Sequence, residues 1–434
     1  MASPGAEALI GWHVNRGWEQ PPDFFPAARF RERFNRPDIV QLVLQTLDED
    51  AAVKRANDAA RRKEDAQPLT ARLPPVIRIV SPPDGASIAR SEVTIGYELR
   101  SPSGLAIERI EALIDGRPQT RGLARVPEAG ATTGTGTLAV AVPQRDAEVT
   151  LIAHAGGLAS EPARIRLVWQ GTAAPAENLL KPKLYALVIG VSDYVTPGLA
   201  LEYAAKDARD FAKALESQRG GLYGGVETRL VTDREVTRVS VLEGLEWLEK
   251  QVTSRDVGIV FLAGHGHNDE RKSYWFLPAD ASPQRLRTMA VSQDDIRRTL
   301  QGLAGKAMLF LDTCHAGQAL ADGSTRRGIA GADINAMVNE LSAAENGVIA
   351  FASSTGREVS VERPEWQNGA FTKALVEALA EGRADLLRNG TITVSQLDAF
   401  VVNRVKELTG GLQHPVMTRP PTVPDFPIAV VRRQ

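Results

Sequence analysis

The first 72 residues open with scattered aromatic side chains and continue with a helical repeat of hydrophobic positions. The aromatic residues are Trp12, Trp18, Phe24, Phe25, Phe30 and Phe34. A helix is predicted to begin near residues 35–38, where proline suits the first turn and Asp38 complements the positive end of the helix dipole. Hydrophobic residues recur at helical spacing as far as Leu47, and residues 51–62 continue as a more polar helix. Such a short segment lacks an independent core, so we expect it to pack against a neighbour or to cap something that precedes it.

Between residues 73 and 170 the pattern changes to short runs in which hydrophobic and polar positions alternate. The predicted strands are residues 76–80, 92–99, 107–114, 137–142, 148–154 and 163–169. Turn signals such as Pro82-Pro83-Asp84-Gly85 separate them. Six or seven strands in about a hundred residues predict an immunoglobulin-like β-sandwich, which we expect to act as a binding or spacer module. The Ala- and Pro-rich residues 171–182 form a linker to the next domain.

From Lys183 to the end, runs typical of buried strands alternate with helical patterns. The predicted strands are residues 184–191, 226–231, 257–262, 307–311, 347–352 and 428–431. The predicted helices are residues 203–216, 241–252, 371–380 and 395–407, with a further helix that starts at Ser292 and carries Asp295 as a capping-box acid. Right-handed crossovers then predict an α/β domain over residues 183–434, with a largely parallel sheet and helices on both faces.

Two short strings follow neighbouring strands of this predicted sheet. They are Ala263-Gly264-His265-Gly266-His267 and Leu311-Asp312-Thr313-Cys314-His315-Ala316-Gly317. The second string holds the only cysteine of the chain, and the two strings together hold three of its six histidines. Because open α/β sheets build their sites at the carboxyl ends of their strands, we expect the two strings to meet there.

The residue types in these strings suit nucleophilic catalysis. A thiol needs a nearby base to become a thiolate, and His265 is placed to take the proton of Cys314 and to return it to a leaving amine. The N–H groups of Gly266 and Cys314 are candidates for an oxyanion hole. A lone cysteine after a buried strand is usually a small core residue, but the surrounding histidines favour the catalytic interpretation. This constellation supports hydrolysis of a peptide or amide bond through an acyl-enzyme.

Composition and charge exclude several other classes. Hydrophobic residues make up 43% of the chain and charged residues 24%, as in ordinary soluble domains. A net charge of −2 argues against electrostatic attraction to nucleic acid or anionic membranes. No apolar run approaches the ~20 residues that cross a bilayer. The amino terminus lacks the basic and apolar regions of a secretory signal, and the single cysteine suits a reducing compartment. We therefore expect a cytoplasmic protein with neither a nucleic-acid nor a membrane partner.

The stretch from Leu184 to Val431 resembles the caspase-like cysteine peptidases (clan CD, family C14), most closely the metacaspase and bacterial orthocaspase branch. The matching strings are residues 186–190, 206–208, 261–266, 277–280, 312–317, 351–354 and 369–372. The interval of about fifty residues between histidine and cysteine also fits this family. The resemblance implies a caspase-like fold, protein substrates, and a catalytic dyad of His265 and Cys314.

The resemblance also implies which residues hold the substrate. Asp207 and Asp312, together with Ser353, occupy positions that bind the residue before the scissile bond in metacaspases. A pair of carboxylates binds arginine in a bidentate manner, binds lysine less well, and repels aspartate. We therefore expect cleavage after Arg, with Lys second.

Regulation is predicted from two further features. The flexible composition of residues 321–331, which lie where caspase-like enzymes divide into subunits, suggests self-processing of a zymogen after Arg326 or Arg327. An activating protease or partner protein is expected to act through the N-terminal region. No cofactor is expected to be required. Calcium, which many metacaspases need, would be held by Asp280, Asp294 and Asp295, although two of these acids suit a helix cap equally well.

Two other functions stay open at the level of sequence. One is a catalytically silent caspase-like scaffold that works through the β-sandwich, against which the intact pair of His265 and Cys314 argues. The other is a metal-binding protein or a different hydrolase, with zinc held by His265, His267, Cys314 and His315. The ligand spacing disfavours zinc because it lacks the usual cysteine pairs and the His-x-x-x-His arrangement.

Overall fold

The computed structural model describes residues 9–19, 21–30, 34, 36–59, 68–119, 131–171, 181–269, 273–314, 334–341, 347–354 and 360–431. Backbone contacts divide the chain into two compact units. The first comprises Met1–Ala112 and Gln119–Trp169, and the second comprises Leu113–Pro118 and Gln170–Gln434. Across the described ranges, no helix combines the length and the hydrophobicity needed to pass through a bilayer.

The first unit begins with a small antiparallel pair of strands, β1 (Gly11–Val14) and β2 (Asp23–Pro26). Two helices follow, α2 (Pro37–Thr46) and α3 (Glu49–Ala59), close to the two ranges predicted from the hydrophobic spacing. Helix α2 begins at the proline as expected, and Asp38 in its first turn pairs with Arg36 at 2.7 Å. Short 3₁₀ turns, η2 (Ala27–Phe30) and η3 (Leu69–Arg72), complete this segment.

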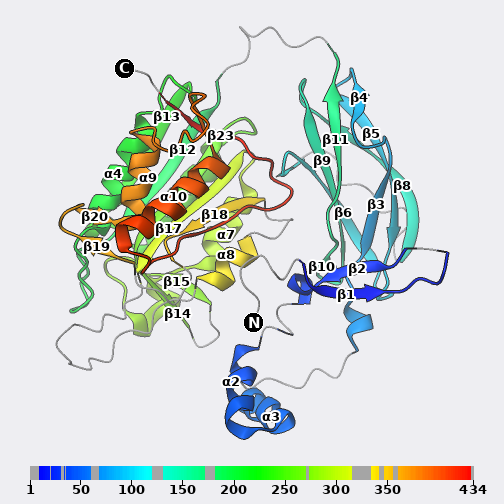
Figure 1. Ribbon diagram of the computed structural model, residues 1–434, viewed down its shortest axis with the longest axis horizontal. Coiled ribbons are helices and arrows are strands. Elements are labelled where there is room, and N and C mark those ends of the chain that lie inside the picture. The colour runs from blue at the N-terminus through cyan, green and yellow to red at the C-terminus, as the bar shows by residue number, and fades with distance from the viewer. Residues whose placement is uncertain are drawn as a thin grey trace. The chain divides into compact units, whose positions relative to one another are not determined.

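Two sheets make up the strand-rich stretch from Val76 to Trp169 (Figure 1). One has the order β3 (Val76–Ser81), β5 (Glu92–Arg100) and β8 (Thr133–Ala141). The other has the order β4 (Ala86–Ile88), β11 (Ala163–Trp169), β9 (Ala147–Ala155), β6 (Ile107–Ile114) and β7 (Arg117–Pro118), with β10 (Leu158–Ala159) beside β9. Alternating side chains such as Ile95, Ile110 and Leu151 are buried, consistent with the predicted β-sandwich.

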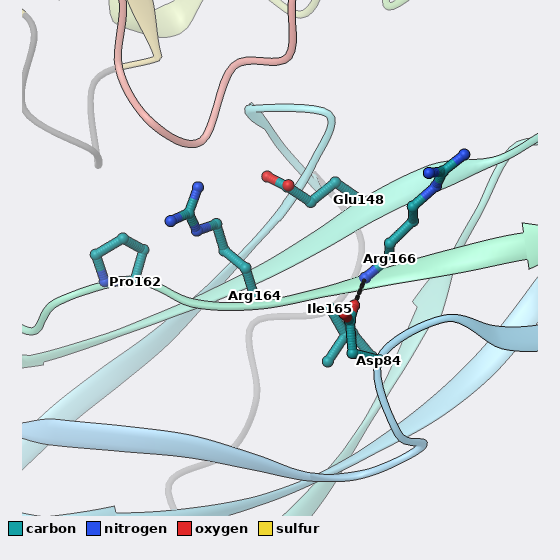
Figure 2. A pocket seen from close by; sticks show the side chains of 6 residues that line it. All are labelled: Asp84, Glu148, Pro162, Arg164, Ile165 and Arg166. Atoms are coloured by element: carbon teal, nitrogen blue, oxygen red, sulfur yellow. Dashed lines mark hydrogen bonds between the residues drawn. The ribbon is translucent and has the colours of Figure 1, made fainter.

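A polar pocket on this unit is lined by Asp84, Glu148, Pro162, Arg164, Ile165 and Arg166 (Figure 2). Asp84 uses a carboxylate oxygen to accept the backbone N–H of Arg166 at 2.7 Å, and that bond ties the turn before β4 to β11. The lining holds neither a histidine nor a hydroxyl or thiol side chain.

A largely parallel sheet forms the centre of the second unit. Its order is β13 (Gly225–Thr232), β12 (Lys183–Gly190), β14 (Val257–Asn268), β17 (Lys306–Cys314), β18 (Val348–Ala352) and β22 (Val416–Thr418). The first five strands run parallel, and β22 runs antiparallel to β18. The end of β14 continues past the sheet and pairs antiparallel with β15 (Tyr274–Phe276), which pairs in turn with β16 (Val291–Ser292).

Helices cover both faces of this sheet, as the alternation of strands and helices predicted. Helices α4 (Ala204–Glu216), α9 (Ala370–Leu379) and α10 (Val394–Thr409) pack on one face. Helices α5 (Arg238–Gln251), α7 (Gln293–Gly302) and α8 (Asn335–Leu341) pack on the other. Figure 1 shows α4, α9 and α10 together beside the strands. The predicted α/β fold, with a largely parallel sheet and helices on both faces, is confirmed.

Several short elements of the second unit were absent from the sequence prediction. They are β15, β16, β22, η5 (Asp233–Glu235), η6 (Pro283–Arg285), α6 (Leu286–Met289), β19 (Glu362–Arg363), β20 (Asn368–Gly369) and β21 (Thr391–Thr393). The predicted last strand forms as β23 (Pro427–Val430), but it pairs with β21 in a separate two-stranded sheet. Strands of two or three residues show no periodicity, so only tertiary pairing reveals them.

Candidate active site

The two strings singled out in the sequence meet at the carboxyl ends of adjacent parallel strands. The register of β14 on β17 places His265 opposite Cys314. Neighbouring strands lie about 4.8 Å apart, so the two backbones are close enough for their residues to act together. Cys314 is the last residue of β17, and its side chain lies outside the described residues. The structure therefore confirms that the two strings meet, as the strand-end argument predicted.

His265 is buried, with 4% of its surface exposed, and is held at both its backbone and its ring. Its backbone N–H donates to the hydroxyl of Tyr194 at 2.7 Å. Its ring Nε2–H donates to the carbonyl oxygen of Leu199 at 2.9 Å. Nδ1 is buried and has no hydrogen-bond partner among the described residues. Because a carbonyl only accepts, the proton of the neutral ring resides on Nε2, and the Nδ1 lone pair is left to act as a base.

Burial also keeps this ring neutral. Removal from water lowers the pKa of His265, and the bond to Leu199 partly opposes that change by raising it. A neutral imidazole near pH 7 is the form that accepts a proton from a thiol.

The backbone of β14 directs the amide of Gly266 towards the Cys314 strand. His265 gives its N–H to Tyr194, and its carbonyl oxygen accepts the N–H of Leu277 at 2.9 Å. Successive residues of a strand point their backbone groups to opposite edges, so the N–H of Gly266 points to the edge that carries β17. That is the orientation an oxyanion hole shared between Gly266 and Cys314 requires.

Asp207 on α4 and Asp312 on β17 meet at a single glycine. A Cβ placed on Gly369 would lie 3.3 Å from Oδ2 of Asp207 and 3.4 Å from Oδ2 of Asp312. Asn368 donates to Asp207 at 2.8 Å, and the hydroxyl of Thr372 donates to Asp312 at 2.7 Å. These partners are neutral, and no ion pair to either carboxylate exists within the described part of the chain. The fold thus brings together the two aspartates that the resemblance grouped.

Removal from water raises the pKa values of both carboxyls of this pair. Burial raises the pKa of Asp312 to about 6. The pKa of Asp207 is also raised, mainly by burial and to a smaller extent by the negative charge of Asp312. Burial removes the hydration of both carboxylates, and no cation among the described residues offsets this desolvation penalty. A cation that entered between them would therefore be strongly attracted.

A third carboxyl, missed by the sequence analysis, belongs to the same cluster. Glu362 lies on β19 directly opposite Gly369 in the pairing of β19 with β20. The pKa of Glu362 is raised to about 7, mainly by burial and to a smaller extent by the negative charge of Asp312. The two-residue strand has no signature in the sequence, so only its pairing with Gly369 reveals this neighbour.

Ser353 supports the cluster from a fully buried position. Its hydroxyl lies 2.9 Å from the hydroxyl of Ser360, and its hydrogen bond to Asp312 lowers the pKa of that carboxyl, against the larger effect of burial. Its backbone carbonyl accepts Nε2–H of Gln413 at 2.8 Å. The structure therefore places Ser353 beside Asp312, as the family resemblance implied.

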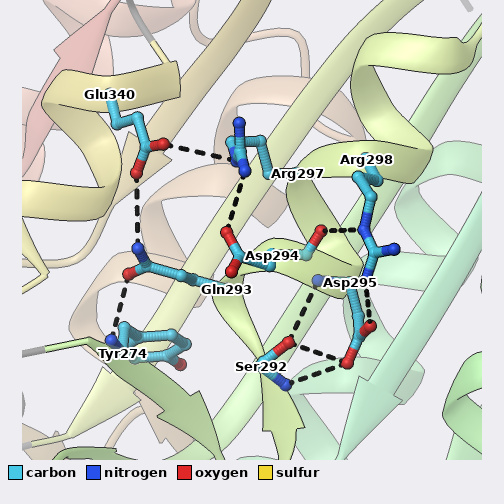
Figure 3. A network of polar contacts seen from close by, with 8 residues as sticks. All are labelled: Tyr274, Ser292, Gln293, Asp294, Asp295, Arg297, Arg298 and Glu340. Carbon is cyan, nitrogen blue, oxygen red and sulfur yellow. Dashed lines mark hydrogen bonds and ion pairs between the residues drawn. The ribbon is translucent and has the colours of Figure 1, made fainter.

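The three acids assigned to calcium have other surroundings, and Figure 3 shows those of Asp294 and Asp295. Asp294 pairs with Arg297 at 2.9 Å. Asp295 caps α7 in a capping box with Ser292, as predicted, and also pairs with Arg298 at 3.0 Å. Asp280 is exposed. In the described ranges no group of three or more His, Cys, Asp or Glu side chains is arranged to hold a metal, and calcium binding stays a prediction.

Of the remaining candidate site residues, the structure describes only His267. His315, Arg326 and Arg327 lie outside the described residues. His267 is half-buried, and its buried Nδ1 has no hydrogen-bond partner in the described part of the structure. Nε2 of His265 donates to a backbone carbonyl, so only Nδ1 of this ring would be left for zinc. His315 and the side chain of Cys314 lie outside the described residues, and zinc binding stays a prediction.

Comparison with known proteins decides the family. The family model described as "Caspase domain" matches residues 183–426. This chain belongs to the caspase-domain family (Peptidase C14). The predicted membership of family C14 is thereby confirmed, and the caspase domain coincides with the sheet that holds His265 and Cys314.

Solved structures resemble parts of the chain at low identity. Protein GSU0716 from Geobacter sulfurreducens is 18% identical with a TM-score of 0.42, over 58% of this chain and 100% of that one. The Drosophila initiator caspase Dronc is 10% identical with a TM-score of 0.37, over 57% of this chain and 82% of that one. Fibronectin(III)-like modules of Clostridium thermocellum CbhA are 19% identical with a TM-score of 0.19, over 23% of this chain and 49% of that one. No curated protein sequence matches this chain.

Proposed function

We propose that this caspase-domain protein is a cysteine endopeptidase that hydrolyses peptide bonds after arginine and, less readily, after lysine. The observation that carries the proposal is the pair Asp207 and Asp312, which meet at Gly369 without a described ion-pair partner. Asp312 lies two residues before Cys314 on the same strand, so a side chain bound by the carboxylates belongs to a substrate residue next to the nucleophile.

The proposed reaction has two halves. Nδ1 of His265 takes the thiol proton of Cys314, and the thiolate attacks the substrate carbonyl carbon while the N–H groups of Gly266 and Cys314 stabilise the oxyanion. The tetrahedral intermediate collapses, the C–N bond breaks, and His265 returns the proton to the leaving amine. Water then attacks the thioester with His265 as base, the C–S bond breaks, and the acid product and the thiol are released.

The carboxylate cluster sets the selectivity. A guanidinium presents planar N–H groups to two carboxylates at once and is charged at every working pH, whereas an ammonium is a compact and strongly hydrated ion. Glu362 adds a third negative group at the same glycine and further favours a cation. A substrate aspartate would add a buried like charge to this cluster and is disfavoured.

We also propose that the chain processes itself after Arg326 or Arg327, which lie in sequence between β17 and α8. Basic residues in a segment of flexible composition are the substrates that an arginine-specific peptidase would accept. Intact mass should show two fragments in the wild type, and the double variant Arg326→Ala/Arg327→Ala should stay whole. Fragments of unchanged mass in that variant would contradict the proposal.

The main test is a panel of fluorogenic peptides that differ only in the residue before the scissile bond, with and without calcium. Wild type should cleave after Arg faster than after Lys and hardly after Asp, and Cys314→Ala and His265→Ala should be inactive. Asp207→Asn should lose arginine cleavage selectively. Faster cleavage after Asp than after Arg would refute the assigned specificity.

A catalytically silent scaffold is the competing function, and thiol reactivity separates the two. A working dyad makes Cys314 react with iodoacetamide faster in the wild type than in His265→Ala, even if no peptide in the panel is a substrate. Equal rates in the two proteins would favour the scaffold.

A further inference from the structure

The segment between β12 and α4 contacts His265 at three points. The hydroxyl of Tyr194 accepts the backbone N–H of His265 at 2.7 Å. The ring of Tyr194 packs against the imidazole, with ring centroids 5.0 Å apart and the planes 39° from each other. The carbonyl of Leu199 accepts Nε2–H at 2.9 Å. One segment therefore restrains both the backbone and the ring of the histidine.

This segment is itself fixed to the scaffold. The N–H of Val195 donates to the carbonyl of Ala279 at 2.8 Å, and the hydroxyl of Thr196 donates to the carbonyl of Ala281 at 3.1 Å. Tyr194 is buried, with 6% of its surface exposed. A side chain anchored in this way holds its neighbour in place, because it has little freedom to follow a displacement of the histidine.

The strand beside Tyr194 leaves room for its hydroxyl. Gly264 has a φ of +147°, and a Cβ at this position would lie 2.6 Å from the Tyr194 oxygen. A side chain here would push the hydroxyl away from the N–H of His265. Gly264 therefore both adopts this backbone conformation and leaves space for the Tyr194 hydroxyl.

We propose that Tyr194 is a positioning residue of the catalytic dyad: its hydroxyl fixes the backbone of His265 and its ring fixes the plane of the imidazole. This inference rests on the proposed peptidase function. Proton transfer depends on the orientation of Nδ1, so a displaced ring slows the chemical step. The substrate carboxylates Asp207 and Asp312 lie on α4 and β17, outside this segment, so binding of the substrate should change little.

The test compares Tyr194→Phe, which removes only the hydroxyl, with Tyr223→Phe as a matched control. Tyr223 is also fully buried in the second unit, and its hydroxyl donates to the carbonyl of Ile428 at 3.0 Å. Each variant removes a buried hydroxyl that takes part in a hydrogen bond, so both should lower the melting temperature. Tyr194→Leu removes the ring as well and gives the larger perturbation.

Tyr194→Phe should lower kcat for an arginine peptide by roughly 5- to 10-fold with KM within about twofold of wild type, since small misplacements of catalytic groups cost rate. Tyr194→Leu should lose roughly 100-fold. The pH below which the rate of Cys314 alkylation falls should be higher in both variants, because a misoriented imidazole stabilises the thiolate less. Tyr223→Phe should retain the kcat and the alkylation profile of the wild type.

Two results would overturn the inference without touching the proposed function. One is a Tyr194→Phe variant with the same kcat and alkylation profile as Tyr223→Phe. The other is a variant whose KM rises while kcat holds, which would make Tyr194 a substrate-binding residue. If wild-type Cys314 is alkylated no faster than in His265→Ala, the dyad itself fails and the inference fails with it.

Discussion

Replacing Asp312 by asparagine should stabilise the fold at pH 8 while it removes cleavage after arginine. The carboxyl is buried among neutral partners, and burial raises its pKa from 3.8 to about 6. At about 1.4 kcal/mol per pH unit, this difference destabilises the folded state by up to about 3 kcal/mol once the group is ionised. Asparagine has nearly the same shape and can still accept the hydroxyl of Thr372, so it escapes that cost.

The pH dependence follows from the direction of the shift. The folded chain binds the Asp312 proton more tightly than the unfolded chain, so stability falls as pH rises from about 4 through about 6. Asparagine has no proton to lose. The gain in unfolding free energy from Asp312→Asn should therefore be small near pH 4 and approach its full value of about 3 kcal/mol by pH 8.

Urea unfolding at pH 4.5, 6 and 8 measures this gain, with Cys314→Ala in both proteins to prevent self-cleavage. The value of kcat/KM for an arginine peptide, measured with Cys314 intact, should fall roughly 100-fold, since removing one partner of a buried charge pair costs about 2–5 kcal/mol. Stability and activity are thus expected to change in opposite directions.

Asp256→Asn is the matched control. Asp256 is also buried, but it accepts the backbone N–H groups of Lys183 at 2.8 Å and Thr253 at 3.0 Å. Its replacement should destabilise the fold at pH 8 and leave kcat/KM unchanged. If Asp312→Asn lost stability at pH 8 as Asp256→Asn does, the carboxylate would be a structural acceptor and the argument for a substrate pocket would be refuted.

Three further outcomes are expected. Glu362→Gln should lower kcat/KM for arginine peptides only about 3- to 10-fold, because Glu362 is partly exposed and solvent screens its charge more than that of Asp312. A loss equal to that of Asp312→Asn would contradict this ranking. The wild type should lose arginine cleavage as pH falls from 8 to 5, because carboxyls with pKa values of about 6 and about 7 become protonated, and a flat profile of kcat/KM would count against them. Gly264→Ala should abolish activity, since the added Cβ would lie 2.6 Å from the Tyr194 hydroxyl, whereas Gly225→Ala, with its nearest contact at 3.6 Å, should stay active in the same assay.

Local patterns were enough to predict the central elements of the fold. The runs before His265 and Cys314 are continuously apolar because both faces of a parallel sheet are covered, and this property is visible in the sequence. The cap of α7 was likewise predictable, since Ser292 and Asp295 stand three residues apart. Elements as short as β19 carry no periodic signal and could not be predicted.

The sequence by itself determined the nature of the candidate chemistry: one cysteine, a histidine on the neighbouring strand, and two aspartates that a family resemblance could group. Only the tertiary structure decided their electrostatics. It buried Asp207 and Asp312 around Gly369, placed Glu362 opposite that glycine, and fixed the proton of His265 on Nε2. These properties depend on desolvation and on partners far away in the sequence, such as Leu199, and therefore arise only once the chain has folded.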